Sequence, residues 1–361
     1  MLTRAEELDQ KLERIRALLG DDQVLRLRGI DWFAWLLSGA SNAVLLAAET
    51  GVAEALVTPT ELYVLTDDIE AGRLIEEELP GNAQVQRFPW ARPAVQENWV
   101  RQTTGPARIL SDRPAPGESL LPDALRKMKL ELTPSELERY SQIGAQAASA
   151  MTEALQAAQP AWTEFELAGA GARALLARGL QPALILAVGA RRLPLYRHAL
   201  PTHAPLKHMA MLVFCARGAG LYANLTRFVS FGPLPGALAD AHQQVREIEA
   251  AALDQCRPGV AVAEMYATFE RAYARHGYPD AITQHHQGGV TGYQAREVVA
   301  RPDSAEIIQQ GMAVAWNPSV PGAKIEDTFA VAPAGLTNLT FDADWPHSMV
   351  GGRPRPLVLT R

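Results

Sequence analysis

Eight histidines and two cysteines set the range of chemistry open to this chain of 361 residues. The histidines lie at positions 198, 203, 208, 242, 276, 285, 286 and 347. An imidazole titrates near neutral pH, so these side chains are the first candidates for proton transfer or metal binding. Cys215 and Cys256 form neither a CxxC metal motif nor a disulfide framework. Such sparse cysteine usage favours a reducing compartment, and we expect a cytoplasmic protein.

The composition is that of an ordinary folded protein and excludes several classes of function. Hydrophobic residues make up 48% of the chain and charged residues 20%, which rules out disordered and fibrous proteins. The formal net charge is -6 and no basic block recurs, so nucleic acid is not an expected partner. The first residues are amphipathic and charged, unlike a signal peptide. No apolar run is long enough to cross a bilayer, so we expect no membrane partner.

The order of the apolar patterns predicts an α+β protein with two domains. The first part is expected to hold helices over 4–19 and 68–79, a buried strand over 32–37 and a hairpin over 53–65. Residues 92–118 are rich in proline, glycine and polar side chains, and we interpret their final part as the connection between the domains. The boundary is placed near Leu132, giving an α/β domain with linker over 1–131 and a second domain over 132–361.

A long helix is expected to open the second domain. Thr133 suits the N-cap, Pro134 the first helical position and Glu136 the third. Further helices are expected over 164–178, 237–255 and 262–276, and strands over 183–188, 209–215, 220–229, 287–299, 312–316 and 326–331. We interpret the proline-rich segment 346–356 as a loop that crosses the surface or reaches a partner subunit.

Five motifs in this second domain resemble those of one known family. They are PAWTEFEL (160–167), YANLTR (222–227), QCRPGV (255–260), GM (311–312) and IEDT (325–328). In this order they resemble motifs of the creatinase / aminopeptidase P / prolidase family. The resemblance implies a C-terminal pita-bread domain, preceded by a smaller α/β domain of the creatinase N-terminal type. It also implies a homodimer in which one N-terminal domain covers the partner's pocket.

Metallopeptidases of that family bind two divalent ions through two Asp, one His and two Glu, so that a bridging water loses a proton near neutral pH. The resemblance places the first Asp at the end of the strand over 209–215, where no acidic residue occurs. It places the other four ligands at Asn224, Gly289, Asn317 and Glu326, of which only the glutamate is retained. A neutral amide binds a divalent ion far more weakly than a carboxylate does. We therefore expect no metal ligands, no cofactor and no dinuclear peptidase.

Creatinase, a metal-free member of the same family, hydrolyses a C–N bond with a histidine as acid and base. By resemblance, the expected catalytic residues are His198, His285 and Glu326, and the expected substrate-binding residues are Arg296, Asn224, Thr226 and Asn317. Creatine itself is not the expected substrate, because Thr226 and Asn317 stand where creatinase has carboxylates.

Three functions remain open. The leading hypothesis is a metal-independent hydrolase in which His198 acts on a non-peptide C–N bond, such as that of an amidine or guanidine. The second is a pseudoenzyme that binds a small molecule, a short peptide or a protein without turnover. The third is a weak Xaa-Pro dipeptidase with a metal ion held by Glu326, His285 and His286. Cys215 is expected to be a small buried hydrophobe rather than a nucleophile.

Overall fold

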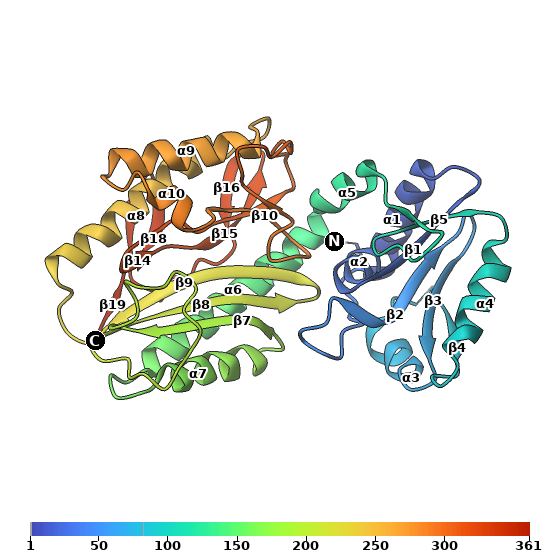
Figure 1. Cartoon of the computed structure of the whole chain (residues 1–361), viewed down its shortest axis with the longest axis horizontal. Helices are drawn as coiled ribbons and strands as arrows, with labels where there is room; N and C mark the ends of the chain where they lie inside the picture. Colours follow the sequence, from blue (N-terminus) through green and yellow to red (C-terminus); the bar gives the residue numbers. More distant parts are fainter. Residues whose placement is uncertain (1, 82) are drawn as a thin grey trace. The chain divides into compact units, whose positions relative to one another are not determined.

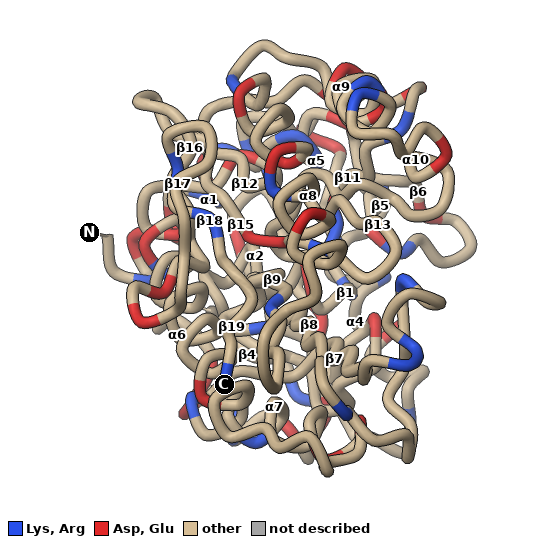
Figure 2. Tube along the Cα trace, turned by 90° about the vertical axis from the view of Figure 1, so that its left-hand side faces the viewer, with Lys and Arg blue, Asp and Glu red and all other residues tan. Residues whose placement is uncertain are grey.

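The computed structural model of the protein describes residues 2–81 and 83–361. The chain folds as two units (Figure 1). The first unit contains the residues up to Lys129 together with Pro134–Glu136, and the second contains Leu130–Thr133 and Leu137–Arg361. No helix of the described residues is long and apolar enough to span a bilayer. Lysine and arginine alternate with acidic residues along the trace rather than forming a block of one sign (Figure 2).

A six-stranded mixed sheet in the order β4-β3-β2-β1-β5-β6 forms the first unit. Its strands are β1 (Gln23–Gly29), β2 (Thr50–Val57), β3 (Leu62–Asp67), β4 (Gln84–Phe88), β5 (Arg108–Ser111) and β6 (Ser119–Leu120). The helical segments include α1 (Arg4–Leu18), α2 (Ile30–Leu36), α3 (Ala71–Arg73) with a π-helical turn (Leu74–Glu78), α4 (Pro93–Thr104) and α5 (Asp123–Leu130). The predicted hairpin is confirmed, since β2 and β3 pair antiparallel with Ala55 opposite Val64.

Two expectations for this unit are wrong. The apolar run expected as a strand over 32–37 lies mostly in the helix α2, whose seven residues are all buried. In a short segment whose residues are all apolar, the hydrophobic pattern has no periodicity. A buried strand and a buried helix therefore cannot be distinguished from the sequence. The final part of residues 92–118 does not connect the domains, because the first unit continues to Lys129, and the earlier part of this segment contains α4 and β5. β5 pairs in parallel with β1, which makes it part of the sheet.

Two larger sheets form the core of the second unit. One has the order β19-β9-β8-β7, and the other has the order β11-β10-β12-β15-β16. The strands of the first are β7 (Gln181–Gly189), β8 (Met209–Gly218), β9 (Leu221–Ser230) and β19 (Leu359–Thr360). Those of the second are β10 (Gly288–Thr291), β11 (Val298–Val299), β12 (Ala313–Trp316), β15 (Asp327–Ala332) and β16 (Gly335–Asn338). An antiparallel bridge between Thr226 and Glu326 joins the two sheets.

The helices of this unit lie close to their predicted bounds. They are α6 (Pro134–Ala157), α7 (Glu164–Leu176), α8 (Gly236–Gln255) and α9 (Val262–Arg275), whereas the short α10 (Ala281–Gln284) was not predicted. α7 begins with a capping box in which the Thr163 hydroxyl accepts from the amide of Glu166, whose carboxylate accepts from the amide of Thr163. α8 and α9 bury their apolar faces against the sheet of β10, β12 and β15, around Phe269 and Trp316 (Figure 1).

The C-terminal segment is a hairpin rather than the expected loop. It consists of β17 (His347–Val350) and β18 (Arg353–Pro356). Arg355 is fully buried, and its guanidinium makes two contacts of 2.6 Å with Glu249 and one of 2.8 Å with Asp327. The segment is therefore tied to the core of its own unit by a buried ion network.

Candidate functional site

Four of the predicted site residues form a buried row where the two sheets join. Asn224 and Thr226 are two residues apart on β9, so their side chains lie on the same face. Thr226 bridges to Glu326, and its amide donates to the Glu326 carbonyl at 3.0 Å. Trp316 lies opposite the first residue of β15, which places the next residue, Asn317, beside Glu326. The side chains of all four predicted residues are at most 2% exposed.

The carboxylate of Glu326 is already neutralised by cations. Arg296 Nη2 donates to Oε1 at 2.6 Å, the Thr226 hydroxyl donates to Oε2 at 2.9 Å, and Lys324 Nζ lies 3.3 Å from Oε2. Burial by itself would raise the pKa of Glu326, but Lys324 and Arg296 outweigh it and lower the pKa to about 2. The carboxylate is therefore ionised and both of its oxygens are occupied.

Lys324 is a site residue that the sequence analysis missed. It is the second residue of β14 (Ala323–Lys324), which pairs with β13 (Ser319–Val320), and it is only 6% exposed. A lysine two residues before a predicted site glutamate was the available signal, because side chains at i and i+2 of an extended segment share a face.

Two buried amide oxygens of this row accept no hydrogen bond from the residues that the structure describes. Asn224 Nδ2 donates to the Tyr222 carbonyl at 3.2 Å and to the Thr291 hydroxyl at 3.0 Å. The Thr291 hydroxyl itself donates to the carbonyl of Gln294, so it accepts from Asn224 and fixes the orientation of that amide. Among the described residues, nothing donates to Oδ1 of Asn224 or of Asn317. Such orphan acceptors are costly, about 1–3 kcal/mol each, unless a ligand or water donates to them.

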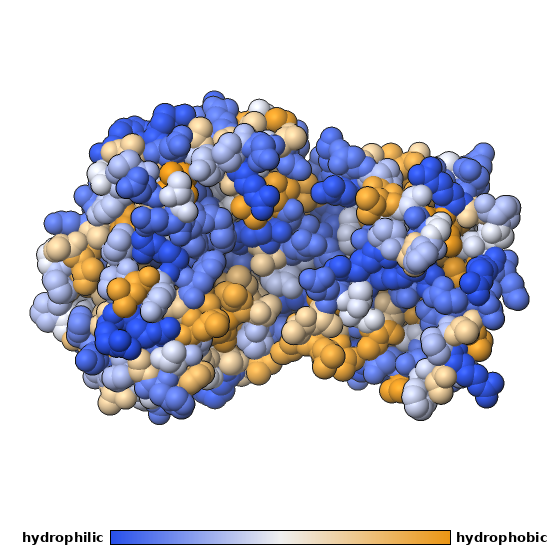
Figure 3. Space-filling model, viewed as in Figure 1, coloured by the Kyte–Doolittle hydropathy of each residue, from blue (hydrophilic) through white to orange (hydrophobic). Residues whose placement is uncertain are grey.

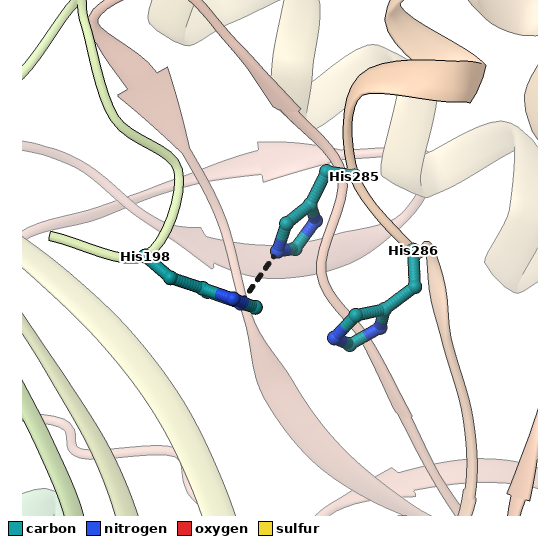
Figure 4. Close-up of side chains that lie close together, drawn as sticks. All are labelled: His198, His285 and His286. Atoms are coloured by element: carbon teal, nitrogen blue, oxygen red, sulfur yellow. Dashed lines mark hydrogen bonds between the residues drawn. The ribbon is translucent and has the colours of Figure 1, made fainter.

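His198, His285 and His286 form a compact cluster of imidazoles. His198 lies in the loop after β7, and His285 and His286 lie between α10 and β10. The Nε2 atoms of His198 and His285 are 2.9 Å apart, and the rings of His285 and His286 stack with centroids 4.6 Å apart (Figure 4). His198 is exposed, His286 is partly buried and His285 is 8% exposed.

All three imidazoles are held in the neutral form. Burial is the main cause that lowers the pKa of each, and the nearby charges of Lys324 and Arg296 lower it further. The pKa of His286 falls to about 4. At neutral pH one proton is therefore shared in the contact between His198 and His285, with one Nε2 donating and the other accepting.

The triad of Glu326, His285 and His286 expected for the third hypothesis is not the cluster that forms. Of the described residues, His198, His285 and His286 are the ones whose potential ligand atoms all lie within 4.8 Å of one another. Glu326 is not in that group, and its carboxylate is paired with Arg296 and Lys324.

Gly288 and Gly289, the first two residues of β10, leave no room for side chains. A Cβ atom on Gly289 would lie 1.9 Å from the carbonyl oxygen of Val298. A Cβ atom on Gly288, which has φ +96°, would lie 2.0 Å from the carbonyl oxygen of Ala315. Any side chain at either position would have to displace a paired strand.

Cys215 lies opposite Asn224 in the pairing of β8 with β9. Burial, together with the charge of Glu326, raises the pKa of its thiol to about 12. Cys215 is thus a protonated thiol at neutral pH and lacks the low pKa of a nucleophilic cysteine.

Comparisons with known proteins agree on the fold. The family model "Metallopeptidase family M24" matches residues 138–333. A Xaa-Pro dipeptidase from Bacillus anthracis has a TM-score of 0.78 at 16% identity, over 98% of this chain and 100% of that chain. The prolidase from Pyrococcus horikoshii OT3 has a TM-score of 0.77 at 16% identity, over 92% of this chain and 98% of that chain.

A structure of another kind has the same fold. The N-terminal domain of the FACT complex subunit SPT16 from Cicer arietinum has a TM-score of 0.68 at 12% identity, over 94% of this chain and 95% of that chain. No curated protein sequence matches. These structures confirm the predicted fold class, an α+β chain with a C-terminal pita-bread domain preceded by a smaller α/β domain.

Proposed function

The chain belongs to metallopeptidase family M24, and we propose that it is a member that works without the family's pair of metal ions. Its activity is the hydrolysis of an activated, non-peptide C–N bond, such as that of an amidine or guanidine. His198 is the acid–base group, His285 orients it, and the row around Glu326 binds the substrate. The observation that carries this function is the 2.9 Å contact between the two imidazoles.

The residues around Glu326 do not fit two divalent ions. A metal ion at this carboxylate would have to displace Arg296 or Lys324 and would then lie beside the other cation. Asn224 and Asn317 offer neutral amide oxygens, which bind hard cations far less strongly than carboxylates. Gly289 offers no ligand at all, and the position has no room for one. The proposed hydrolysis therefore does not use a pair of metal ions at Glu326.

His198 has the properties of a general base. Its ring is exposed and can reach a bound substrate or water, while buried His285 fixes its orientation. Because its pKa is lowered, His198 is neutral at pH 7 and can accept a proton from the attacking water. The same proton can then pass to the leaving nitrogen. A positioned histidine of this kind is worth a factor of about 10²–10⁴ in rate.

The row of polar groups suits a ligand that carries both N–H groups and an anionic group. The free Oδ1 atoms of Asn224 and Asn317 can accept from the N–H groups. Arg296 Nε has no hydrogen-bond partner among the described residues and can donate to an anionic group. Thr226 holds Glu326 in place through its hydroxyl.

Turnover by matched histidine variants tests this function. Wild type, His198→Ala and His208→Ala are assayed on a panel of amidines, guanidino compounds and amides. His208 is exposed and lies outside the cluster, so it controls for the loss of an imidazole. Turnover should fall in His198→Ala and persist in His208→Ala. Equal turnover in the two variants would overturn the role of His198.

A second candidate is a pseudoenzyme that binds its ligand without turnover. The two orphan amide oxygens favour it, because they suit binding but cannot activate water. A thermal-shift screen of amino acids, dipeptides and guanidino compounds tests it, with Asn224→Ala as the variant. A ligand that raises the Tm of wild type but not of Asn224→Ala, and is recovered unchanged, supports this candidate. Absence of any shift would remove the support for binding of small ligands.

We also propose that the protein is a cytoplasmic homodimer, as the family resemblance implies. Exposed apolar side chains offer surface for a partner subunit, among them Leu45, Leu195 and Leu200. Apolar patches are visible on the face of the molecule shown in Figure 3. Light scattering coupled to size exclusion should give twice the mass of the chain, and a monomeric mass would contradict the dimer.

A further inference from the structure

We infer that His198, His285 and His286 form a binding site for a single transition-metal ion of intermediate softness, with Zn²⁺ as the representative ion. The site is separate from the carboxylate row, since none of its three side chains contacts Glu326 within hydrogen-bond distance. It also differs in donor chemistry, because three imidazole nitrogens replace a set of oxygen ligands.

The geometry is close to that of a three-histidine zinc site. Zinc–imidazole bonds of about 2.0–2.1 Å place tetrahedral ligand nitrogens about 3.3 Å apart. The Nε2 atoms of His198 and His285 are 2.9 Å apart, and the ligand atoms of all three side chains lie within 4.8 Å. One ring nitrogen of each residue points toward the space between them (Figure 4). Because His198 lies on an exposed loop, small adjustments of its position can open the contact and bring in the third ring.

The protonation state favours metal binding. A histidine must be neutral to bind a metal ion, and burial together with nearby cations lowers the pKa of each of the three imidazoles, which favours the neutral form. His285 is more than nine-tenths buried and its Nδ1 has no partner among the described residues, so the contact that a metal ion has to displace at this ring is that of Nε2 with His198. His286 gives up one long hydrogen bond, since its Nδ1 accepts from the amide of Gly288 at 3.3 Å.

The charges around the cluster set its selectivity. Lys324 and Arg296 repel a divalent ion, and Glu326 offsets only one of these two charges. Ions that depend on carboxylate ligands, such as Mg²⁺ and Mn²⁺, gain too little from three neutral imidazoles to overcome this repulsion. Zn²⁺ and Co²⁺ bind imidazole more strongly. The cluster therefore distinguishes Zn²⁺ from Mn²⁺.

Metal binding would also act on the proposed chemistry. A bound ion occupies the lone pair of the ring nitrogen of His198 and displaces the proton that it shares with His285. Zn²⁺ is then a reversible inhibitor of the hydrolase. This inhibition rests on the proposed function, whereas binding of the ion does not.

Binding is measured on the full metal-free chain by competition for Zn²⁺ with a chromophoric chelator, and Co²⁺ absorption reports the geometry. Wild type and His208→Ala should each bind one Zn²⁺, give the intense visible bands of tetrahedral Co²⁺ and bind Mn²⁺ far more weakly. In His198→Ala and His286→Ala the affinity for Zn²⁺ should fall by at least roughly 10–100-fold. That is the loss typical when a hydrogen-bond partner of a metal ligand is removed, and removal of a ligand itself should cost no less.

Several results would overturn the site. They are no uptake of Zn²⁺ by folded wild type, uptake unaffected by both variants, or Mn²⁺ binding as tight as Zn²⁺ binding. His198 and His286 are not in the hydrophobic core, so thermal melts of these variants should match wild type and exclude misfolding as the cause. If wild type hydrolysed no compound of the amidine panel, the proposed hydrolase function would fail, but the predicted Zn²⁺ binding would be unaffected. Failure of the function and failure of the metal site can therefore be distinguished.

Discussion

Arg296 Nη2 lies 2.6 Å from Glu326 Oε1, and the glutamate of this ion pair is only 2% exposed. Lys324 approaches the other carboxylate oxygen at 3.3 Å. A buried carboxylate without such partners would bear a large desolvation cost. The charge balance of the site is therefore supplied by side chains of the chain itself.

Replacing Arg296 by an uncharged residue should destabilise the protein. Arg296→Met leaves Glu326 with Lys324 alone, and the free energy of unfolding should fall by about 2–4 kcal/mol, near the 3–5 kcal/mol typical of a broken buried pair. Urea denaturation measures the loss. The double variant Arg296→Met, Glu326→Gln should recover part of it, because no buried carboxylate is then left short of cations. Additive losses would contradict the pairing.

The free energy of unfolding should also depend on pH because of Glu326. The pKa of this group is lowered from 4.5 to about 2 in the folded protein. Its stabilisation is therefore fully present above pH 4.5 and is lost as the pH falls toward 2. Between pH 5 and pH 3, wild type should lose about 2 kcal/mol more than Glu326→Gln. Parallel stability curves for the two proteins would show that Glu326 has an ordinary pKa.

The pH profile of turnover should reflect the environment of His198. A general base works only when neutral, and burial with the charge of Lys324 lowers the pKa of this imidazole below 6.5. The acidic limb of kcat/KM should therefore have its midpoint below pH 6.5. Lys324→Met should move that midpoint upward, since a repelling charge is removed. A midpoint above 6.5 in wild type would contradict the assignment.

The backbone at Gly289 should tolerate no side chain. Gly289→Ala places a Cβ atom 1.9 Å from the Val298 carbonyl oxygen and should destabilise the protein by about 2 kcal/mol or more. Gly169→Ala is the matched control, because this glycine lies inside α7 with nothing within 4 Å. The control should gain about 0.5–1 kcal/mol from helix propensity. Equal stability of the two variants in thermal melts would show that the strands give way.

Local signals predicted most of the second unit, and long-range packing accounts for what they missed. Thr133 and Pro134 predicted the start of α6, and apolar segments, among them the continuous run over 209–215, predicted β8 and β9. The strand expected over 32–37 failed because burial on all sides removes the periodicity. Arg355 was assigned to a surface loop because its partners, Glu249 and Asp327, are distant in sequence.

The candidate site could be predicted only in part for the same reason. Family resemblance pointed to His198 and His285 one by one, but their contact spans 87 positions of the chain. The ring of His286 stacks on that of His285, and its centroid lies 5.7 Å from that of His198. Lys324 belongs to none of the five motifs; its position two residues before Glu326 was a signal, and the fold shows that its ammonium group lies 3.3 Å from that carboxylate.

Turnover after removal of metal ions distinguishes a metal-independent hydrolase from a metallopeptidase. Wild type and His198→Ala, both stripped with a chelator, are assayed on the amidine and guanidine panel and on Xaa-Pro dipeptides, with and without added Mn²⁺. Metal-free wild type should hydrolyse a compound of the panel, His198→Ala should be about 10²–10⁴-fold slower, and Mn²⁺ should produce no dipeptide cleavage. Turnover that appears only with Mn²⁺, together with cleavage of Xaa-Pro dipeptides, would contradict the account.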